Sequence, residues 1–163
     1  MNRNTAQRGF TLVELMLSLG IIILLAAIAA PMFGSNDSMQ LSIAKRLLVS
    51  DLEYAQILAI ANPDEEIALC IDPSGKGWCI TTIDAPTTPL TDAITGEPLL
   101  TILGEGAGAP SGDVVVQSNT AGNMVAFDPN GGLVDFSQAV QLLLQSGELE
   151  TSVDINPTTG SIR

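Results

Sequence analysis

The chain has 163 residues, enough for one ordinary domain with an appendage, and it carries 18 acidic side chains, 6 basic ones and no histidine. Because histidine is the commonest general base and metal ligand, its absence excludes Ser-His-Asp and Cys-His catalysis and histidine-based metal sites. A formal net charge of -12 disfavours binding to nucleic acids and anionic lipid headgroups. We therefore expect neither catalytic residues nor a cofactor.

The apolar residues are concentrated near the N-terminus, where 17 of the 21 residues in the range 10–30 are apolar. As a helix this segment would be about 31 Å long, which matches a hydrocarbon thickness of about 30 Å. The preceding residues 1–9 carry only the charges of Arg3 and Arg8. Basic residues before a membrane span favour a cytoplasmic N-terminus, so the chain after Pro31 is expected outside.

A cleaved secretory signal peptide is the alternative interpretation of this segment. The apolar core of a signal peptide is typically about 7 to 15 residues and ends at a small-residue site. Residues 10–30 are longer than that, yet their last five positions are rich in alanine, so the pattern leaves both interpretations open.

Glu14 is the unusual residue of the apolar segment. A carboxylate costs about 2.5 to 3.5 kcal/mol at the centre of a bilayer, and residues of this kind are functional by default. If the chain were cut after Gly9, Glu14 would lie one helical turn from a new amine on Phe10. The carboxylate and the amine would then neutralise each other, within one chain or between neighbours.

The sequence Arg8-Gly9-Phe10-Thr11-Leu12-Val13-Glu14-Leu15-Met16, followed by an apolar run that ends at Pro31, resembles the leader of type IV prepilins and type II secretion pseudopilins. The resemblance implies cleavage between Gly9 and Phe10 by a prepilin peptidase and N-methylation of Phe10. It also implies that Glu14 contacts the Phe10 amine of a neighbouring subunit during assembly on an inner-membrane platform.

A second helix is expected over residues 38–61. Pro31 should kink or stop the first helix, and one of residues 35–37 is expected to cap the restarted one. Small and large apolar residues then recur at steps of three and four, and the amphipathic pattern predicts a helix packed on its own domain. Asn62-Pro63 should end it. The stripe consists of Leu41, Ala44, Leu48, Leu52, Ala55 and Ala59, widened by Ile43, Leu47, Tyr54 and Leu58, with Lys45, Arg46, Asp51 and Glu53 mostly outside it.

After Pro63 the sequence alternates short apolar runs with clusters of Gly, Pro, Asn and Asp, which predicts strands and turns. One long helix followed by antiparallel strands is an α+β fold, here a periplasmic β-rich domain over residues 63–163. Residues 85–98 and 104–112 are expected to be surface loops. The predicted strands cover residues 67–71, 78–83, 99–103, 114–118, 124–127, 140–144, 151–155 and 161–163.

This layout is similar to the minor pseudopilins of the H type and to related minor pilins. Three features carry the similarity: Gly77-Trp78 opening a strand, Phe127-Asp128-Pro129 followed by glycines, and a closing hairpin in which a turn joins residues 153–155 to Gly160-Ser161-Ile162. The similarity implies a structural subunit that other pseudopilins contact through the N-terminal helix.

Cys70 and Cys79 lie symmetrically about a predicted turn centred on Ser74 and Gly75, so they should oppose each other on antiparallel strands. Opposed residues of this kind lie within the Cα separation of a disulfide, and the periplasm is oxidising. We expect a Cys70–Cys79 disulfide. Two buried free cysteines are the main alternative, and a metal or redox pair is a further one.

The remaining acidic residues give no clear site. Asp64-Glu65-Glu66 is interpreted as a solvated turn. Asp92, Glu97 and Glu105 match no EF-hand spacing, so a calcium site is not favoured. No phosphate-binding glycine loop or nucleophile elbow is present in the sequence.

The sequence therefore predicts a minor pseudopilin of a type II secretion system, anchored by residues 10–30 in the bacterial inner membrane, with residues 31–62 continuing the helix. A minor type IV pilin for pilus assembly or DNA uptake is the alternative, and the acidity of the chain disfavours its DNA-binding form. A membrane-tethered enzyme has no positive support in the sequence.

Overall fold

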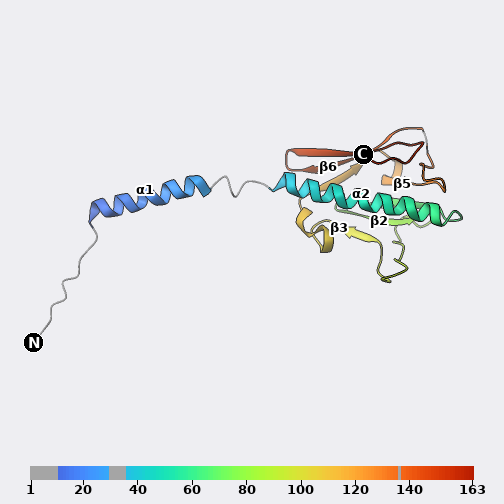
Figure 1. Ribbon diagram of the computed structural model, residues 1–163, viewed down its shortest axis with the longest axis horizontal. Coiled ribbons are helices and arrows are strands. Elements are labelled where there is room, and N and C mark those ends of the chain that lie inside the picture. Colours follow the sequence, from blue (N-terminus) through green and yellow to red (C-terminus); the bar gives the residue numbers. More distant parts are fainter. Residues whose placement is uncertain (1–10, 30–35, 136) are drawn as a thin grey trace, which may run out of the picture. The chain divides into compact units, whose positions relative to one another are not determined.

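The structure is a computed structural model that describes residues 11–29, 36–135 and 137–163. The chain divides into two compact units, residues 1–35 and 36–163. We call the second unit the head domain. Figure 1 shows the elements of both units in chain order.

The first unit contains one helix, α1 (Leu12–Ala29). Thr11 precedes it, and its hydroxyl accepts a hydrogen bond from the backbone N–H of Glu14 at 3.2 Å, which is N-terminal capping. Gly9, Phe10 and Pro31, to which the sequence assigns processing and a kink, lie outside the described residues. Within the described ranges, no helix combines the length and the apolarity that crossing a membrane would require.

The head domain begins with α2 (Asp37–Ala61), one residue longer at its start than predicted. Asn36 is the N-cap residue but makes no side-chain capping bond. At the other end, the backbone and side-chain amides of Asn62 both donate to the carbonyl of Leu58, so the helix ends where Asn62-Pro63 predicted.

Two antiparallel sheets follow α2. The four-stranded sheet has the order β3-β2-β1-β5, with β1 (Ile67–Ile71), β2 (Gly77–Thr82), β3 (Leu100–Ile102) and β5 (Met124–Ala126). The three-stranded sheet has the order β4-β6-β7, with β4 (Val115–Ser118), β6 (Val140–Ser146) and β7 (Leu149–Ile155). The predicted α+β class and seven of the predicted strands are confirmed, with boundaries that shift by at most two residues.

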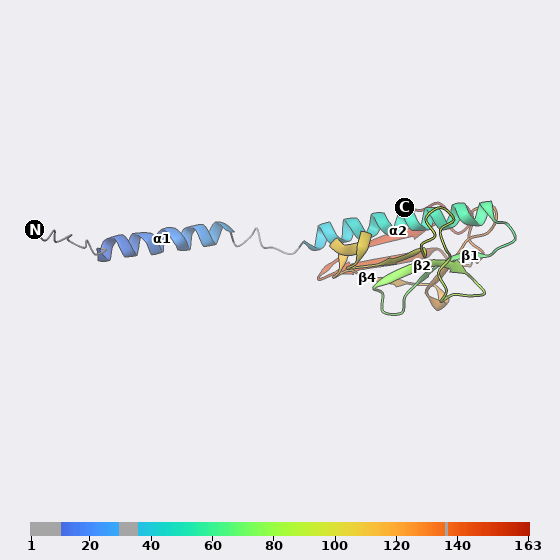
Figure 2. The same cartoon turned by 90° about the horizontal axis from the view of Figure 1, so that it is seen from below.

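The core lies between α2 and the two sheets. Figures 1 and 2 show α2 lying along one side of both sheets, and it contacts β1, β6 and β7. The predicted stripe is confirmed, because its six residues are the buried apolar residues of this helix: Leu41, Ala44, Leu48, Leu52, Ala55 and Ala59. Inward-facing residues of both sheets complete the core, among them Trp78 and Phe127, each 1% exposed.

Two glycine turns tie the head domain together. Gly75, at the tip of the β1–β2 hairpin, has a φ of +70°, and its carbonyl accepts a hydrogen bond from the backbone N–H of Val116 on the other sheet. Gly160 has a φ of +63° and packs against the carbonyl of Gly131, where a Cβ would collide. The side-chain amide of Gln56 on α2 donates to the carbonyls of both Gly131 and Gly160. Glycine is therefore required at these positions for conformation and for close approach.

Two expectations are wrong. Residues 104–112 are not simply a surface loop, because η2 (Gly106–Ser111) is a 3-10 helix that contacts α2, and Ser111 donates to the carbonyl of Gln40 at 3.2 Å. Residues 161–163 form no strand. Ile162 makes an isolated bridge with Ile155, and Arg163 and Asp154 exchange backbone hydrogen bonds.

A buried polar contact also fastens α2 to the four-stranded sheet. One carboxylate oxygen of Asp51 accepts hydrogen bonds from the Trp78 indole N–H at 2.7 Å and from the Thr101 hydroxyl at 2.8 Å. The sequence placed Asp51 mostly outside the packed stripe, and it is not among the six buried residues of α2, but its half-buried side chain still reaches Trp78 and Thr101. Its acceptor role lets the indole be buried without losing a hydrogen bond.

We expect Asp51→Ala to lower the free energy of unfolding of the head domain by about 2 to 3 kcal/mol, because a buried indole N–H would lose its acceptor. Glu53→Ala is the matched control, because Glu53 is exposed two residues further along the same helix, and its effect should stay within about 0.5 kcal/mol. Urea unfolding of dilute protein measures both. Equal losses for the two variants would contradict the anchoring role of Asp51.

Candidate assembly site

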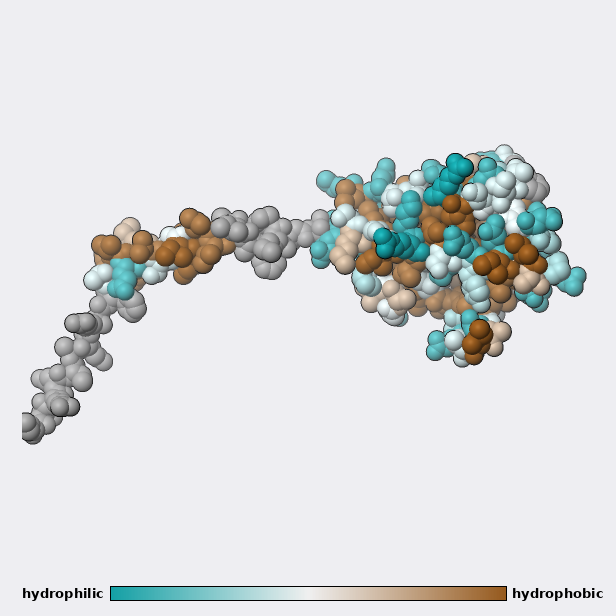
Figure 3. Space-filling model, viewed as in Figure 1, coloured by the Kyte–Doolittle hydropathy of each residue, from teal (hydrophilic) through white to brown (hydrophobic). Residues whose placement is uncertain are grey.

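The surface of α1 is apolar on every side. Eleven large apolar residues between Leu12 and Leu25 are 53% to 76% exposed, and Figure 3 shows mostly hydrophobic colour, with a hydrophilic spot near its start, on the face of this helix that is in view. A helix that is apolar all round requires an apolar environment, which is supplied by lipid or by other protein. The eleven residues are Leu12, Val13, Leu15, Met16, Leu17, Leu19, Ile21, Ile22, Ile23, Leu24 and Leu25.

The polar groups of α1 are largely satisfied within the helix itself. The hydroxyl of Ser18 donates to the carbonyl of Glu14 at 2.7 Å, and Thr11 caps the first turn. The carboxylate of Glu14 makes no hydrogen bond or ion pair with any residue of the range 11–29. Thr11 and Glu14 also have the spacing of a capping box, a sequence signal that our sequence interpretation missed. Glu14 thus lies in the first turn of α1, where its backbone N–H is capped by Thr11 and its carboxylate is unpartnered among residues 11–29.

The cysteine hairpin has the predicted register. Cys70 opposes Cys79, and Ile71 opposes Trp78, on β1 and β2. The Asp72–Gly77 pair is hydrogen-bonded through the N–H of Asp72, and hydrogen-bonded pairs recur every second residue, so Cys70 and Cys79 also form such a pair, with a Cα separation of about 5.5 Å. That separation fits a disulfide.

Both cysteines are free thiols in the structure and are half-buried. Burial raises the pKa of each thiol above its ordinary value, and the nearby Asp72 carboxylate raises it further. Together with Trp78, Leu100 and Ile102 they line a groove of about 600 Å³ over the outer surface of the four-stranded sheet. The disulfide stays a prediction, and the register is the part of it that the structure confirms.

The loop acids do not converge on a common site. Asp92 accepts hydrogen bonds from its own loop, at 2.7 Å from the N–H of Ile94 and 2.8 Å from the N–H of Thr95, and its other oxygen lies 3.4 Å from the Tyr54 hydroxyl. Among the described residues, no three acidic or cysteine side chains are grouped to hold a metal ion. Asp92, Glu97 and Glu105 therefore are not brought together as ligands.

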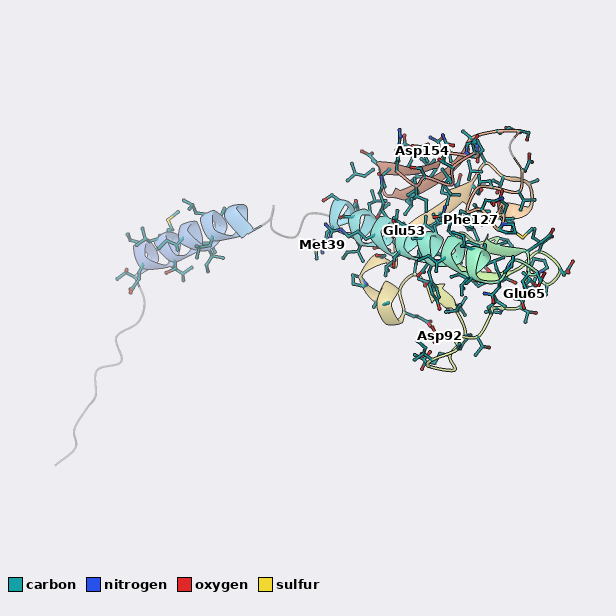
Figure 4. The ribbon with its side chains drawn as sticks, turned by 45° about the vertical axis from the view of Figure 1, so that its right-hand side comes forward. Met39, Glu53, Glu65, Asp92, Phe127 and Asp154 are labelled. Atoms are coloured by element: carbon teal, nitrogen blue, oxygen red, sulfur yellow. The ribbon has the colours of Figure 1, made fainter. Side chains whose placement is uncertain are left out.

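The segment Asp64-Glu65-Glu66 is exposed directly after α2, as expected for a solvated turn. Figure 4 shows Glu65 and Asp92 on separate loops of the head domain. The acidic residues are thus dispersed over the surface rather than gathered into a site.

Two families match this chain. The family described as type II transport protein GspH matches residues 44–159, and the prokaryotic N-terminal methylation motif matches residues 4–30. Comparison with curated proteins finds no match.

Among solved structures, two crystal forms of the type IV minor pilin FimU from Pseudomonas aeruginosa strain PAO1 are similar to this chain, each with a TM-score of 0.49 and 19% sequence identity. The alignments cover 75% of this chain and 89% or 84% of the pilin chain.

The cysteine pair yields a stability prediction. Oxidised head domain should contain no titratable thiol, and Cys70→Ser should lower its free energy of unfolding by about 2 to 3 kcal/mol, the chain-entropy value for a short loop. Thiol labelling and urea unfolding, each with and without reductant, measure both effects. Reductant should remove the difference in stability between the wild type and the variant. Full labelling of unfolded, oxidised wild type would contradict the disulfide.

The loop carboxylates yield a pH prediction. The N–H groups of Thr95 and Ile94 lower the pKa of Asp92 below 3.8, and the Ser74 hydroxyl and N–H do the same for Asp72. Since the unfolded chain binds more protons in this range, the stabilisation is complete well above pH 3.8 and is lost as the pH falls through the lowered values. The free energy of unfolding should therefore decrease as the pH is lowered from about 4.

In Asp92→Asn, the free energy of unfolding should decrease less steeply at acidic pH than in the wild type. The reason is that the amide oxygen still accepts the loop hydrogen bonds but does not titrate in this range. Urea unfolding between about pH 2.5 and 6 measures this. Glu148→Gln is the control, since this exposed carboxylate accepts no hydrogen bond from the described residues. If Asp92→Asn had the same pH dependence of stability as the wild type, the contribution of Asp92 to acid sensitivity would be contradicted.

Proposed function

This chain belongs to the family of the type II transport protein GspH, and we propose that it is a minor pseudopilin that enters the periplasmic pseudopilus of a type II secretion system through its N-terminal helix. The proposed role is structural assembly rather than catalysis. The observation that carries the proposal is the apolar circumference of α1 with one carboxylate, Glu14, unpartnered among residues 11–29.

The apolar surface of α1 supports transfer between two apolar environments. Complete burial of one large apolar side chain is worth about 1.5 to 3 kcal/mol relative to water, so α1 strongly avoids exposure to solvent. We infer that residues 10–30 lie in the inner membrane before assembly and among sister helices afterwards. Because lipid and neighbouring apolar helices solvate such a surface similarly, leaving the membrane need not expose it to water.

Glu14 favours one axial position between neighbouring helices, which the apolar surface alone does not. We infer that a prepilin peptidase cuts between Gly9 and Phe10, that the new amine of Phe10 is methylated, and that this amine pairs with Glu14 of a neighbouring subunit. In an apolar bundle an unpaired carboxylate is costly, so the axial stagger that pairs the two charges is favoured over other staggers.

The charge of the head domain supports protein partners rather than DNA. Residues 36–163 contain 17 acidic and 4 basic side chains. Two of the four basic groups already bind backbone carbonyls, Lys45 that of Ser152 at 2.6 Å and Lys76 those of Gly112 and Val114 at 2.8 and 3.1 Å. Too few cations remain to neutralise a phosphate backbone.

We expect Glu14→Ala to remain in the membrane fraction but to fall at least tenfold in sheared pseudopilus fractions, because it lacks the charge that sets the stagger. Ser18→Ala is the matched control on α1, since the Ser18 hydroxyl bonds its own helix and should be dispensable. Quantitative immunoblotting of both fractions measures the effect.

Mass spectrometry of the mature N-terminus is needed alongside, and both variants should begin with methylated Phe10. Undiminished incorporation of correctly processed Glu14→Ala would refute the role of Glu14. A mature chain that starts after residue 30 would refute the retained helix and, with it, the proposed function.

A further inference from the structure

Strand β3 lies at the edge of the four-stranded sheet, and no described strand pairs with its outer side. Its residues alternate between the two faces of the sheet. The hydroxyl of Thr101 bonds Asp51 of α2 on the inner face, whereas Leu100 and Ile102 are 46% and 40% exposed on the outer face. β3 therefore presents two exposed apolar side chains beside an unpaired edge.

Two backbone groups on this edge have no hydrogen-bond partner among the described residues. The carbonyl of Leu99 accepts a hydrogen bond from β2. Groups that face β2 recur at every second residue, so those of Leu100 and Ile102 face away from it. The N–H of Leu100 donates to the carbonyl of Pro98, and the carbonyl of Ile102 accepts from the N–H of Glu105. The Leu100 carbonyl and the Ile102 N–H remain.

These two groups have the spacing that a strand added in parallel requires. In a parallel ladder, one residue of the added strand donates its N–H to one carbonyl and accepts a hydrogen bond from the N–H two residues further along. Leu100 and Ile102 supply this carbonyl and this N–H, so the added residue would lie opposite Thr101. The residues on either side of it would place their side chains on the outer face of the sheet.

Two hollows beside β3 leave room for such a segment. The groove of about 600 Å³ over the outer surface of the sheet is lined in part by Leu100 and Ile102. A second hollow, of about 230 Å³, is lined by β3 and residues 105–108. The volume of the groove lies within the range of about 300 to 1,000 Å³ that is typical of ligand sites. A backbone at the edge could therefore place alternate side chains in the groove.

The charges around the two hollows favour a cationic occupant. The carboxylate of Asp72 lines the groove, and that of Glu105 lines the hollow at the edge. The one basic residue of the two linings, Lys76, already donates to the carbonyls of Gly112 and Val114 at 2.8 and 3.1 Å. Basic side chains would thus meet carboxylates here, while apolar side chains would meet Leu100 and Ile102.

We propose that β3 and the outer groove bind an extended polypeptide segment of another protein, parallel to β3, with apolar side chains at alternate positions and basic side chains between them. This is β-strand addition, in which backbone hydrogen bonds give affinity and pockets for alternate side chains give specificity. A second copy does not fit, because the described residues of this chain contain no free basic segment. Lys45 and Arg46 lie within α2, and Arg163 exchanges backbone hydrogen bonds with Asp154.

The test uses the head domain, residues 36–163, because its buried apolar residues all lie between Leu41 and Ile155. The probe is a dye-labelled heptapeptide of alternating valine and lysine, with blocked ends, and fluorescence anisotropy measures its binding. We expect a dissociation constant below about 100 µM. Replacing every lysine by glutamate, or every valine by serine, should raise this constant at least tenfold.

Methylation of the peptide's backbone nitrogens tests strand addition directly. With valines on the groove side, the residue opposite Thr101 is a lysine, and its N–H is the one that bonds Leu100. Methylation of the lysine nitrogens should therefore raise the dissociation constant at least tenfold, whereas methylation of the valine nitrogens, which point away from β3, should leave it unchanged. Equal affinities of the two methylated peptides would overturn the proposal, because a cationic amphiphile of any kind would then suffice.

Variants of the head domain test the site on the protein. Ile102→Asp should raise the dissociation constant at least tenfold, and urea unfolding checks that this variant is folded. Val134→Asp is the matched control, since Val134 is 43% exposed and lines neither hollow. No binding to the wild type, or equal losses in the two variants, would overturn the proposal. None of these results bears on Glu14, since the fragment lacks α1.

Discussion

The packing of α2 against two sheets is the constraint on which the head domain depends. Neither sheet is large, with four strands in one and three in the other, and a sheet of this size needs an element to cover its apolar face. The stripe of α2 covers both at once, since it contacts β1 of the first sheet and β6 and β7 of the second. Polar contacts at Asp51 and Gln56 then fix the helix over this shared core.

The two helices of the chain solve the problem of apolar surface in opposite ways. α2 buries its stripe within its own domain, and all six stripe residues are at most 5% exposed. α1 has apolar residues on every side, and none of the residues 11–29 that the structure describes in this unit covers them. Stability of the head domain is therefore a property of one chain, whereas the environment of α1 must come from outside it. That division is what an assembling subunit requires.

The sequence predicted the parts of the fold that depend on local periodicity. The six-residue stripe of α2, the opposition of Cys70 to Cys79 and the strand positions all follow from repeats of three to four or of two residues. The family assignment followed in the same way from a short contiguous motif, and it is confirmed by the two family matches. Patterns of this kind lie within a few neighbouring residues and can be read directly.

Contacts between distant residues were not predictable by these means. Asp51 bonds Thr101, 50 residues away, and Lys45 bonds Ser152, 107 residues away. The helical pattern alone placed both polar side chains mostly outside the stripe and could not identify these partners. The burial of Ser111 in η2 likewise depends on the approach of this segment to α2, and that of Gly108 depends on its approach to Ile102 of β3. Such partners are defined only once the sheets are placed against the helix.

Electrostatics and apolar burial make different contributions to the assembly that we propose. Each head domain has 17 acidic and 4 basic side chains, so two head domains repel each other. At physiological salt this repulsion is largely screened when their charges are more than about 8 Å apart. The apolar surface of α1 selects an axial position only weakly, because large apolar side chains extend along most of its length. We infer that the carboxylate of Glu14, which is unpartnered among residues 11–29, makes the staggers unequal and so favours one register.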